Sequence, residues 1–494
     1  MNFISTRDKN SKQYTAAQVI KQGLADDGGL FVPTKIPYLS EEEITSFSSL
    51  SYPELAATIL AKFLTDYSYE ELLEDCKTAY SEEKFSECVC PLNKVDNHTY
   101  SLELWHGPTC AFKDMALQIM PKLLSRALVK TGENRIALVL VATSGDTGKA
   151  ALEGYKDIPQ IKICVFYPQN GVSTVQELQM TTQNGNNVNV SAVRGNFDDI
   201  QSGVKRIFND NLIADELNEN GYFLSSANSI NFGRLAPQIV YYIKAYSDLL
   251  AKSEVEFGEK INICVPTGNF GNILAAYIAK LMGLPINKLI CASNSNNILT
   301  DFLKTGRYDK NREFYLTMSP SMDILISSNL ERLLYFVGGV EQTVEYMSTL
   351  NKNGFYQVNN EIKSKIDEHF IGYFTDENQT LNTIKKYYDI NGYLMDTHTA
   401  VAFSALENYR SEHPDKTKTI VASTASPYKF AKNVYGAIFG RNNLDDVQTL
   451  QELSKQTDTE IPMPLYELDK KQIRFDTVTT PADMYEEVLR FIEK

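Results

Sequence analysis

The sequence has few of the residues from which metal centres and disulfide frameworks are built. Its 494 residues include five histidines and seven cysteines, and no Cys-x-x-Cys pair occurs. The histidines show neither the helix-paired spacing nor the neighbouring ligands that zinc sites use. These patterns indicate reduced thiols and no bound metal.

Long hydrophobic runs are also missing. No apolar stretch approaches the roughly 20 residues that cross a bilayer. Residues 1–13 are polar and of mixed charge, and they lack the apolar core of a secretory signal. We therefore expect a cytoplasmic protein that makes no membrane contact.

Positive charge is in short supply. Lysine and arginine number 48 against 62 aspartates and glutamates, which gives a net charge of -14. This charge repels polyanions, so nucleic acid is not an expected partner, and any small anion needs a local site built for it. The hydrophobic fraction of 43% is that of an ordinary globular protein, and the length predicts more than one domain.

What the sequence does contain, from residue 99 onward, is an alternation of short β-branched apolar runs with amphipathic stretches. This alternation is typical of parallel sheets that helices cover on both faces. The expected strands are residues 136–141, 161–166, 188–193, 261–265, 289–292 and 419–422. The expected helices of this part are residues 147–155, 172–181, 197–209, 272–282 and 399–409.

We expect an α/β fold with a two-lobed core of parallel-type sheets flanked by helices, preceded by a mostly helical domain. Helices of the leading domain are expected at residues 15–22, 40–47 and 52–64, and a final helix at 481–492. The expected domains are residues 1–97 for the leading domain, 98–430 for the core and 431–494 for a carboxyl-terminal extension that packs on the core. Within the core, the smaller lobe is expected at roughly 135–245. A possible helical insertion without a buried strand is expected at 303–388.

One lysine is expected to be catalytic. A Gly-Pro turn leads into a helix whose first turn holds it, in the string His106-Gly107-Pro108-Thr109-Cys110-Ala111-Phe112-Lys113-Asp114. The positive end of the helix dipole and any burial both favour the neutral amine, which imine formation and proton transfer require. The alternative is a solvated surface lysine, and the apolar neighbours Ala111, Phe112 and Met115 count against it.

A second cluster predicts a phosphate site. The string Thr267-Gly268-Asn269-Phe270-Gly271-Asn272 follows an expected strand and opens an expected helix. Its glycines let backbone N–H groups converge, and the helix dipole adds positive potential. The alternative is a plain strand-to-helix turn.

Two further clusters lie where other strands end. The string Thr143-Ser144-Gly145-Asp146-Thr147-Gly148 offers hydroxyls and amides suited to a carboxylate, or serves only as a helix cap. The string Ser423-Thr424-Ala425-Ser426-Pro427 follows the last strand, at the edge where open parallel sheets bind ligands, and its hydroxyls could serve a heterocycle's nitrogen or merely end the strand.

Together these strings resemble the threonine synthases, pyridoxal phosphate (PLP) enzymes of the tryptophan-synthase β-like fold, fold type II. The likeness covers nearly the whole chain. It includes Ser5-Thr6-Arg7 and the string Gly23-Leu24-Ala25-Asp26-Asp27-Gly28-Gly29-Leu30 in the leading domain, and Leu102-Glu103-Leu104-Trp105 before the lysine string.

The resemblance implies a role for each cluster. Lys113 would form the Schiff base with PLP and carry protons, and Gly268, Asn269, Phe270, Gly271 and Asn272 would hold the cofactor phosphate. Thr424 would face the pyridine nitrogen. Ser144, Asp146 and Thr147 would lie by the substrate carboxylate and the ring hydroxyl, and Ser229, Asn231 and Arg234 at the substrate end of the cleft. The implied reaction converts O-phospho-L-homoserine and water to L-threonine and phosphate, in a monomer or homodimer.

The sequence departs from the family pattern at three points. It has Ser426 where the family usually has histidine, Phe232-Gly233-Arg234 where Trp-Ala-Arg is common, and Thr397 where proline often precedes His398. Two other functions therefore stay open, a related PLP lyase that yields a 2-keto acid and a non-catalytic PLP-binding sensor. We interpret His398 as a satisfied core histidine and Lys429 as a surface charge.

Overall fold

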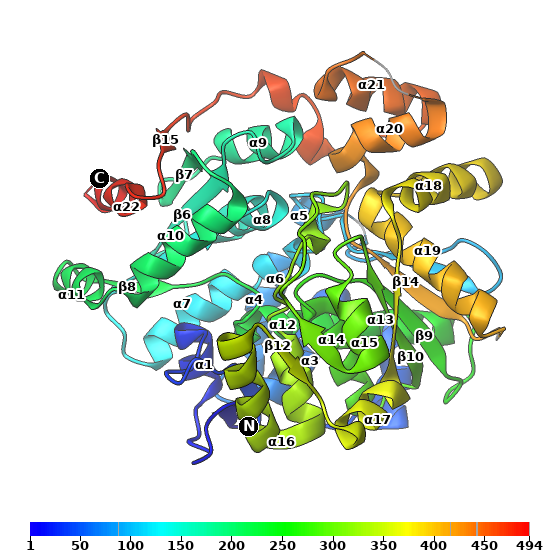
Figure 1. Cartoon of the computed structure of the whole chain (residues 1–494), viewed down its shortest axis with the longest axis horizontal. Helices are drawn as coiled ribbons and strands as arrows, with labels where there is room; N and C mark the ends of the chain where they lie inside the picture. Colours follow the sequence, from blue (N-terminus) through cyan, green and yellow to red (C-terminus); the bar gives the residue numbers. More distant parts are fainter. Residues whose placement is uncertain (87, 415, 441–442, 494) are drawn as a thin grey trace.

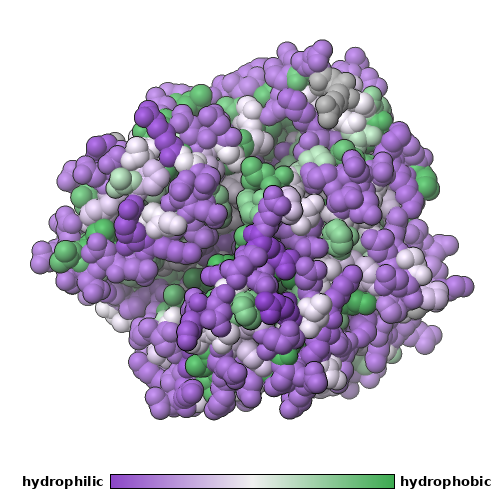
Figure 2. Space-filling view, in the orientation of Figure 1, coloured by the Kyte–Doolittle hydropathy of each residue, from purple (hydrophilic) through white to green (hydrophobic). Residues whose placement is uncertain are grey.

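Two sheets, both covered by helices, organise the chain (Figure 1). The computed structural model describes residues 1–86, 88–414, 416–440 and 443–493. Within these residues no helix is both long and apolar enough to cross a membrane, and no three metal-binding side chains gather. The exposed face in Figure 2 is largely hydrophilic and is hollowed near its centre.

The larger sheet has six strands in the order β13-β10-β9-β14-β4-β3. Every neighbouring pair is parallel except β3 and β4. The strands are β3 Leu92–Lys94, β4 Thr99–Glu103, β9 Ile261–Pro266, β10 Ile286–Ser293, β13 Phe370–Phe374 and β14 Thr419–Ser423. Because β4, β9 and β14 are parallel neighbours, the segments that follow them emerge at one edge of the sheet.

The smaller sheet has five parallel strands in the order β15-β7-β6-β5-β8. These are β5 Ile136–Ala142, β6 Ile161–Pro168, β7 Val188–Val193, β8 Tyr222–Ser225 and β15 Val478–Thr479. Helices α8 Asp146–Tyr155, α9 Thr174–Thr181 and α10 Phe197–Asn209 follow β5, β6 and β7 in turn. Each is thus a strand-to-helix unit with the helix beginning at the carboxyl end of its strand.

The six strands and five core helices expected from the sequence are confirmed. The remaining two core helices are α14 Gly271–Leu281 and α19 Thr397–Glu412. The leading helices are α1 Ala16–Gln22, α2 Glu41–Ser46 and α3 Tyr52–Phe63. The last helix, α22 Met484–Ile492, begins three residues later than expected.

The expectation that residues 303–388 lack a buried strand is wrong. The segment contains β13, which pairs with β10 at the edge of the larger sheet, and β11 Arg307–Asp309 paired with β12 Phe355–Gln357. The strand β13 was hidden because helix α17 Asn360–His369 runs directly into it with no turn residue between them. The helical part is present as α16 Leu330–Asn353, α17 and α18 Glu377–Asn391.

The leading segment is tied to the core by buried polar contacts. The short pair β1 Phe3–Ser5 and β2 Phe31–Pro33 lies against the start of α16, where Arg7 forms a two-point ion pair with Glu331. The fully buried Arg332 donates to the carbonyl oxygens of Phe31 and Ile230. The apolar residues of this segment belong to the same core cluster as both sheets. The division of the chain at residues 97 and 430 remains a prediction.

The carboxyl-terminal chain connects the two lobes. Helix α20 Ala431–Phe439 packs against α18, and α21 Asp446–Thr457 packs against α20, after which the chain crosses to the smaller lobe (Figure 1). There β15 joins the edge of the smaller sheet, and Met484, Val488 and Phe491 of α22 pack with β5, β6 and α10.

Gly154 sets how closely α8 approaches α6 Asp114–Leu117, the short helix that begins directly after Lys113. A Cβ atom at Gly154 would lie 1.9 Å from the carbonyl oxygen of Leu117. We predict that Gly154→Ala lowers the free energy of unfolding by about 1–3 kcal/mol, because the two helices must separate. The apparent Tm measures this.

Gly436 provides the matched control for this prediction. It also lies inside a helix, α20, but nothing surrounds its Cβ position within 4 Å. Gly436→Ala should therefore stabilise the protein by up to about 1 kcal/mol through helix propensity alone. A rise in Tm for both variants would show that the close contact at Gly154 is absent.

Candidate active site

Lys113 lies at the centre of the site. It immediately precedes α6 rather than lying within its first turn as expected, and the residue is 8% exposed. Its Nζ donates to Ser321 Oγ at 3.0 Å and lies 3.7 Å from Asp146 Oδ2. Burial lowers the pKa of Lys113 to about 8; Asp146 acts against this, whereas Arg234 and Lys429 add to it. The site thus holds a lysine that loses its proton far more readily than an exposed one.

Asp146 is held between two lysines. Its Oδ1 lies 2.6 Å from Lys429 Nζ and accepts a hydrogen bond from Gln176 Nε2 at 2.9 Å. Burial alone would raise the pKa of this carboxyl, but Lys429 and Lys113 outweigh burial and bring it well below its usual range. Gly145 allows Gln176 to come this close, because a Cβ there would lie 2.4 Å from the glutamine amide. Asp146 is therefore a fixed negative charge beside Lys113.

The interpretation of Lys429 as a surface charge is wrong. Its side chain is fully buried, and Nζ also donates to the carbonyl oxygen of Thr109 at 3.0 Å. The sequence offered a signal for this position, since Lys429 lies between the apolar Tyr428 and Phe430 directly after a strand-end cluster. Gln176 and Ser321 were also missed, and neither carries a motif that marks it.

A short segment contacts Lys113 through Ser321. Ser321 belongs to the 3-10 turn Pro320–Met322, and its backbone N–H donates to His398 Nε2 at 3.1 Å. His398 Nδ1 lies 2.7 Å from Asp396, so both ring nitrogens have partners and the interpretation of a satisfied core histidine is confirmed. Gly268 is required here, because a Cβ would lie 2.5 Å from the carbonyl oxygen of Ser321.

The loop Gly268–Asn272 fits a phosphate group. Phe270 has a left-handed backbone with φ 62°, after which α14 begins with its unpaired N–H groups. Asn272 Oδ1 accepts hydrogen bonds from Tyr241 and Tyr242, both at 2.6 Å, which orients Nδ2 as a donor. Nδ2 is buried and has no partner among the described residues. A phosphate oxygen would supply the missing acceptor.

The remaining strand-end residues line the same region. Thr424 is buried, and its carbonyl oxygen accepts from Phe112 N–H at 2.8 Å, which joins its strand end to the lysine segment. Ser144 and Thr147, at the start of α8, are partly exposed. Among the described residues, no hydrogen bond joins Ser426 to Lys113; its Oγ caps the 3-10 turn Pro427–Phe430.

Of the three residues expected at the substrate end, two have side chains available. Arg234 is 6% exposed and donates to the carbonyl oxygen of Ala227, but no described carboxylate pairs with it. Burial lowers the pKa of Arg234 to about 10. Ser229 is partly exposed. Asn231 is used structurally, because its amide donates to Ile20 O and accepts from Gly233 N–H.

Comparison with known proteins assigns the chain. Residues 2–80 match the family model described as threonine synthase N terminus, residues 94–424 the pyridoxal-phosphate dependent enzyme family, and residues 399–492 the threonine synthase C-terminal family. The human protein threonine synthase-like 1 is 40% identical over 88% of this chain, which spans only 60% of the human protein. Threonine synthase of Pseudomonas aeruginosa is 38% identical over 89% of this chain and 91% of its own.

Solved structures agree with this assignment and confirm the predicted fold class. PLP-bound threonine synthase from Brucella melitensis is 34% identical, with a TM-score of 0.88 over the whole of both chains. Threonine synthase from yeast is 34% identical, with a TM-score of 0.89 over 100% of this chain and 98% of its own. The chain therefore belongs to the threonine synthase family, within the pyridoxal-phosphate dependent enzymes.

Proposed function

We propose that the protein converts O-phospho-L-homoserine and water into L-threonine and phosphate. The observation that carries this proposal is Lys113, a buried amine of lowered pKa fixed between Ser321 and Asp146, beside a loop with an unused phosphate donor. The names of relatives that match this chain over nearly the whole of their own length support the same reaction.

The chain's residues divide the work in this proposal. PLP, when bound, supplies an electron sink for the substrate's carbon atoms. Gly268–Asn272 hold its phosphate, with Asn272 Nδ2 as one donor, and the Thr424 hydroxyl faces its ring nitrogen. Lys113 carries protons at Cα and Cβ of the substrate, which its lowered pKa permits near neutral pH. Asp146, kept ionised by Lys429, holds the Lys113 amine in place.

Arg234 is proposed to receive the substrate's phosphate. A buried guanidinium without a carboxylate partner is costly unless a ligand supplies the charge. Arginine also matches phosphate geometry better than lysine does. Ser144 and Thr147, at the amino-terminal end of α8, are proposed to bind the substrate carboxylate.

The reaction itself is tested by product analysis. Purified protein with PLP and O-phospho-L-homoserine should release threonine and phosphate in equal amounts, measured by chromatography and a phosphate assay. A dominant 2-oxobutyrate product would identify the lyase alternative, and absence of any product with cofactor bound would identify the sensor.

Lys113→Ala tests the assignment of the lysine. We predict that turnover falls by a factor of about 10³ or more, since both the proton carrier and the cofactor attachment are lost. Borohydride reduction followed by peptide mass spectrometry should find the cofactor on the Lys113 peptide of the unchanged protein only. Reduction at another lysine would contradict the assignment.

Lys429→Met tests the ion pair between Lys429 and Asp146. The Lys429 charge helps to lower the pKa of Lys113, so its removal should raise that pKa. The limb on which kcat rises with pH, expected near pH 8, should therefore move to higher pH, because kcat reports the substrate complex in which Lys113 is a free amine. At neutral pH kcat should fall by roughly tenfold or more. Lys432→Met, an exposed lysine one turn further along, is the control and should leave the pH profile unchanged. A fall in activity without a shift of the pH limb would reduce Lys429 to a packing role.

A further inference from the structure

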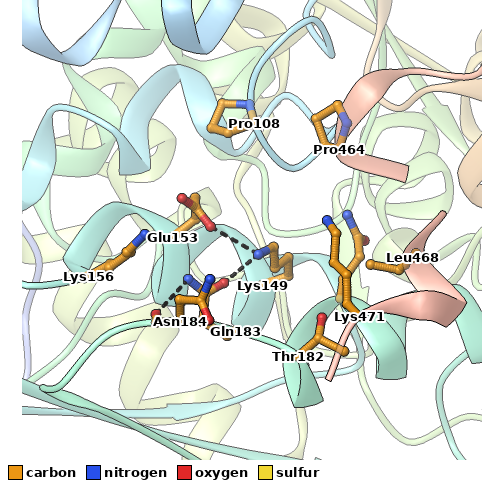
Figure 3. A pocket seen from close by; sticks show the side chains of 11 residues that line it. Pro108, Lys149, Glu153, Lys156, Thr182, Gln183, Asn184, Pro464, Leu468 and Lys471 are labelled. Carbon is orange, nitrogen blue, oxygen red and sulfur yellow. Dashed lines mark hydrogen bonds and ion pairs between the residues drawn. The ribbon is translucent and has the colours of Figure 1, made fainter. Parts of the chain in front are cut away.

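A cavity lies outside the candidate active site. It has a volume of about 240 Å³. Its walls come from Pro108, from α8, from the end of α9 with the residues after it, and from the carboxyl-terminal extension near Pro464 and Lys471 (Figure 3). None of the site residues expected from the sequence lines it.

The cavity is positively charged in an otherwise acidic protein. It is lined by three lysines, Lys149, Lys156 and Lys471, and by one carboxylate, Glu153. Lys149 Nζ is paired with Glu153 at 3.0 Å and also donates to Gln183 (Figure 3). Lys156 and Lys471 form no ion pair with a described residue. The wall therefore keeps two lysines without an ion-pair partner among the described residues.

Other lysines lie near enough to influence the charged groups of this wall. Burial lowers the pKa of Lys149, Glu153 opposes the shift, and Lys471 adds to it. Burial likewise lowers the pKa of nearby Lys84, with contributions from Lys122 and Lys156. Like charges gathered against a low-dielectric wall raise the local concentration of anions.

The cavity and the candidate active site lie at two ends of one polar seam. Asp146, Lys149 and Glu153 recur along one face of α8, and the facing side chains are Gln176, Gln179 and Gln183. At one end Gln176 binds Asp146, and at the other Gln183 binds Lys149. Lys149 follows Asp146 by three residues in α8, which corresponds to about 4.5 Å along the helix axis.

The middle of the seam contacts the segment that carries Lys113. Gln179 Nε2 donates to the carbonyl oxygen of Thr109 at 3.4 Å, and Lys429 donates to the same oxygen. Thr109 in turn binds Asp114 through both its backbone N–H and its hydroxyl, each at 2.8 Å. A ligand in the cavity would touch Pro108, the residue before Thr109.

We propose that this cavity is a second anion site, which binds a phosphate group between Lys149, Lys156 and Lys471, separate from the loop Gly268–Asn272. The two unpaired lysines match the two charges of a phosphate dianion, whereas a carboxylate would leave one lysine without a partner. The lysine ammonium group is a compact charge with three N–H donors. Lysines on different walls of the cavity can therefore bind one phosphate group.

The test uses the full-length, PLP-loaded protein and isothermal titration with inorganic phosphate. The unchanged protein should show a binding event that the double variant Lys156→Ala/Lys471→Ala loses or weakens by about tenfold or more, because both unpaired charges are gone. Lys455→Ala, an exposed lysine of α21 that does not line the cavity, is the matched control and should bind as the unchanged protein does. Glycerol 2-phosphate in a parallel titration distinguishes free phosphate from a phosphate ester as the preferred source.

Two results would overturn the proposal. One is the absence of phosphate binding by the unchanged protein; the other is a double variant that keeps the same number of sites and the same affinity. Lys156 and Lys471 are partly or fully exposed, so folding should persist, and the visible absorbance of the bound cofactor verifies it. Lys471→Glu provides an independent variant, expected to weaken phosphate binding further than Lys471→Ala. These readouts do not require turnover, so they stand apart from the proposed reaction.

Discussion

The buried carboxylate of Asp146 between two ammonium groups is the interaction on which the candidate site depends. One negative charge serves Lys113 at 3.7 Å and Lys429 at 2.6 Å, so the three groups leave a net positive charge in a region that water scarcely reaches. An excess cation of this kind favours loss of a proton from the more weakly held lysine, Lys113. It also favours the entry of an anionic substrate or cofactor.

Close approaches at three glycines that do not touch the reacting groups keep Asp146 in position between Lys113 and Lys429. Gly154 lets α8 lie against α6, Gly145 admits Gln176, and Gly268 admits the segment that carries Ser321. Each glycine removes a side chain at a close approach, so the position of Asp146 relative to Lys113 is set by backbone packing. Such positioning is stiffer than positioning by long flexible side chains.

The sequence predicted the fold best where the hydrophobic period of a segment and its length indicate the same kind of element. The strands of both sheets are short apolar runs with turn residues at their ends, and the order of strand-end clusters followed from the parallel arrangement. It missed β13 because α17 runs into that strand without a break, and it missed Gln176, Ser321 and the buried state of Lys429 because their partners lie far away in the chain. Local sequence patterns locate Lys113 and the loop Gly268–Asn272. Ion pairs between residues far apart in the chain can be identified only from the folded structure. For the same reason Asn231, which lies in a motif, proved to be a structural cap.

The pairing of β15 with β7 has a consequence for how the chain is made. The smaller sheet assembles four of its strands from residues 136–225, but its fifth strand and the helix that covers it come from residues 478–492. During synthesis β7 is therefore an open edge, with unpaired backbone groups, while some 250 residues of the chain are still being added. The nascent smaller lobe is exposed to wrong strand pairing until residues 478–492 arrive, which makes this edge the place where chaperones or aggregation would compete with folding.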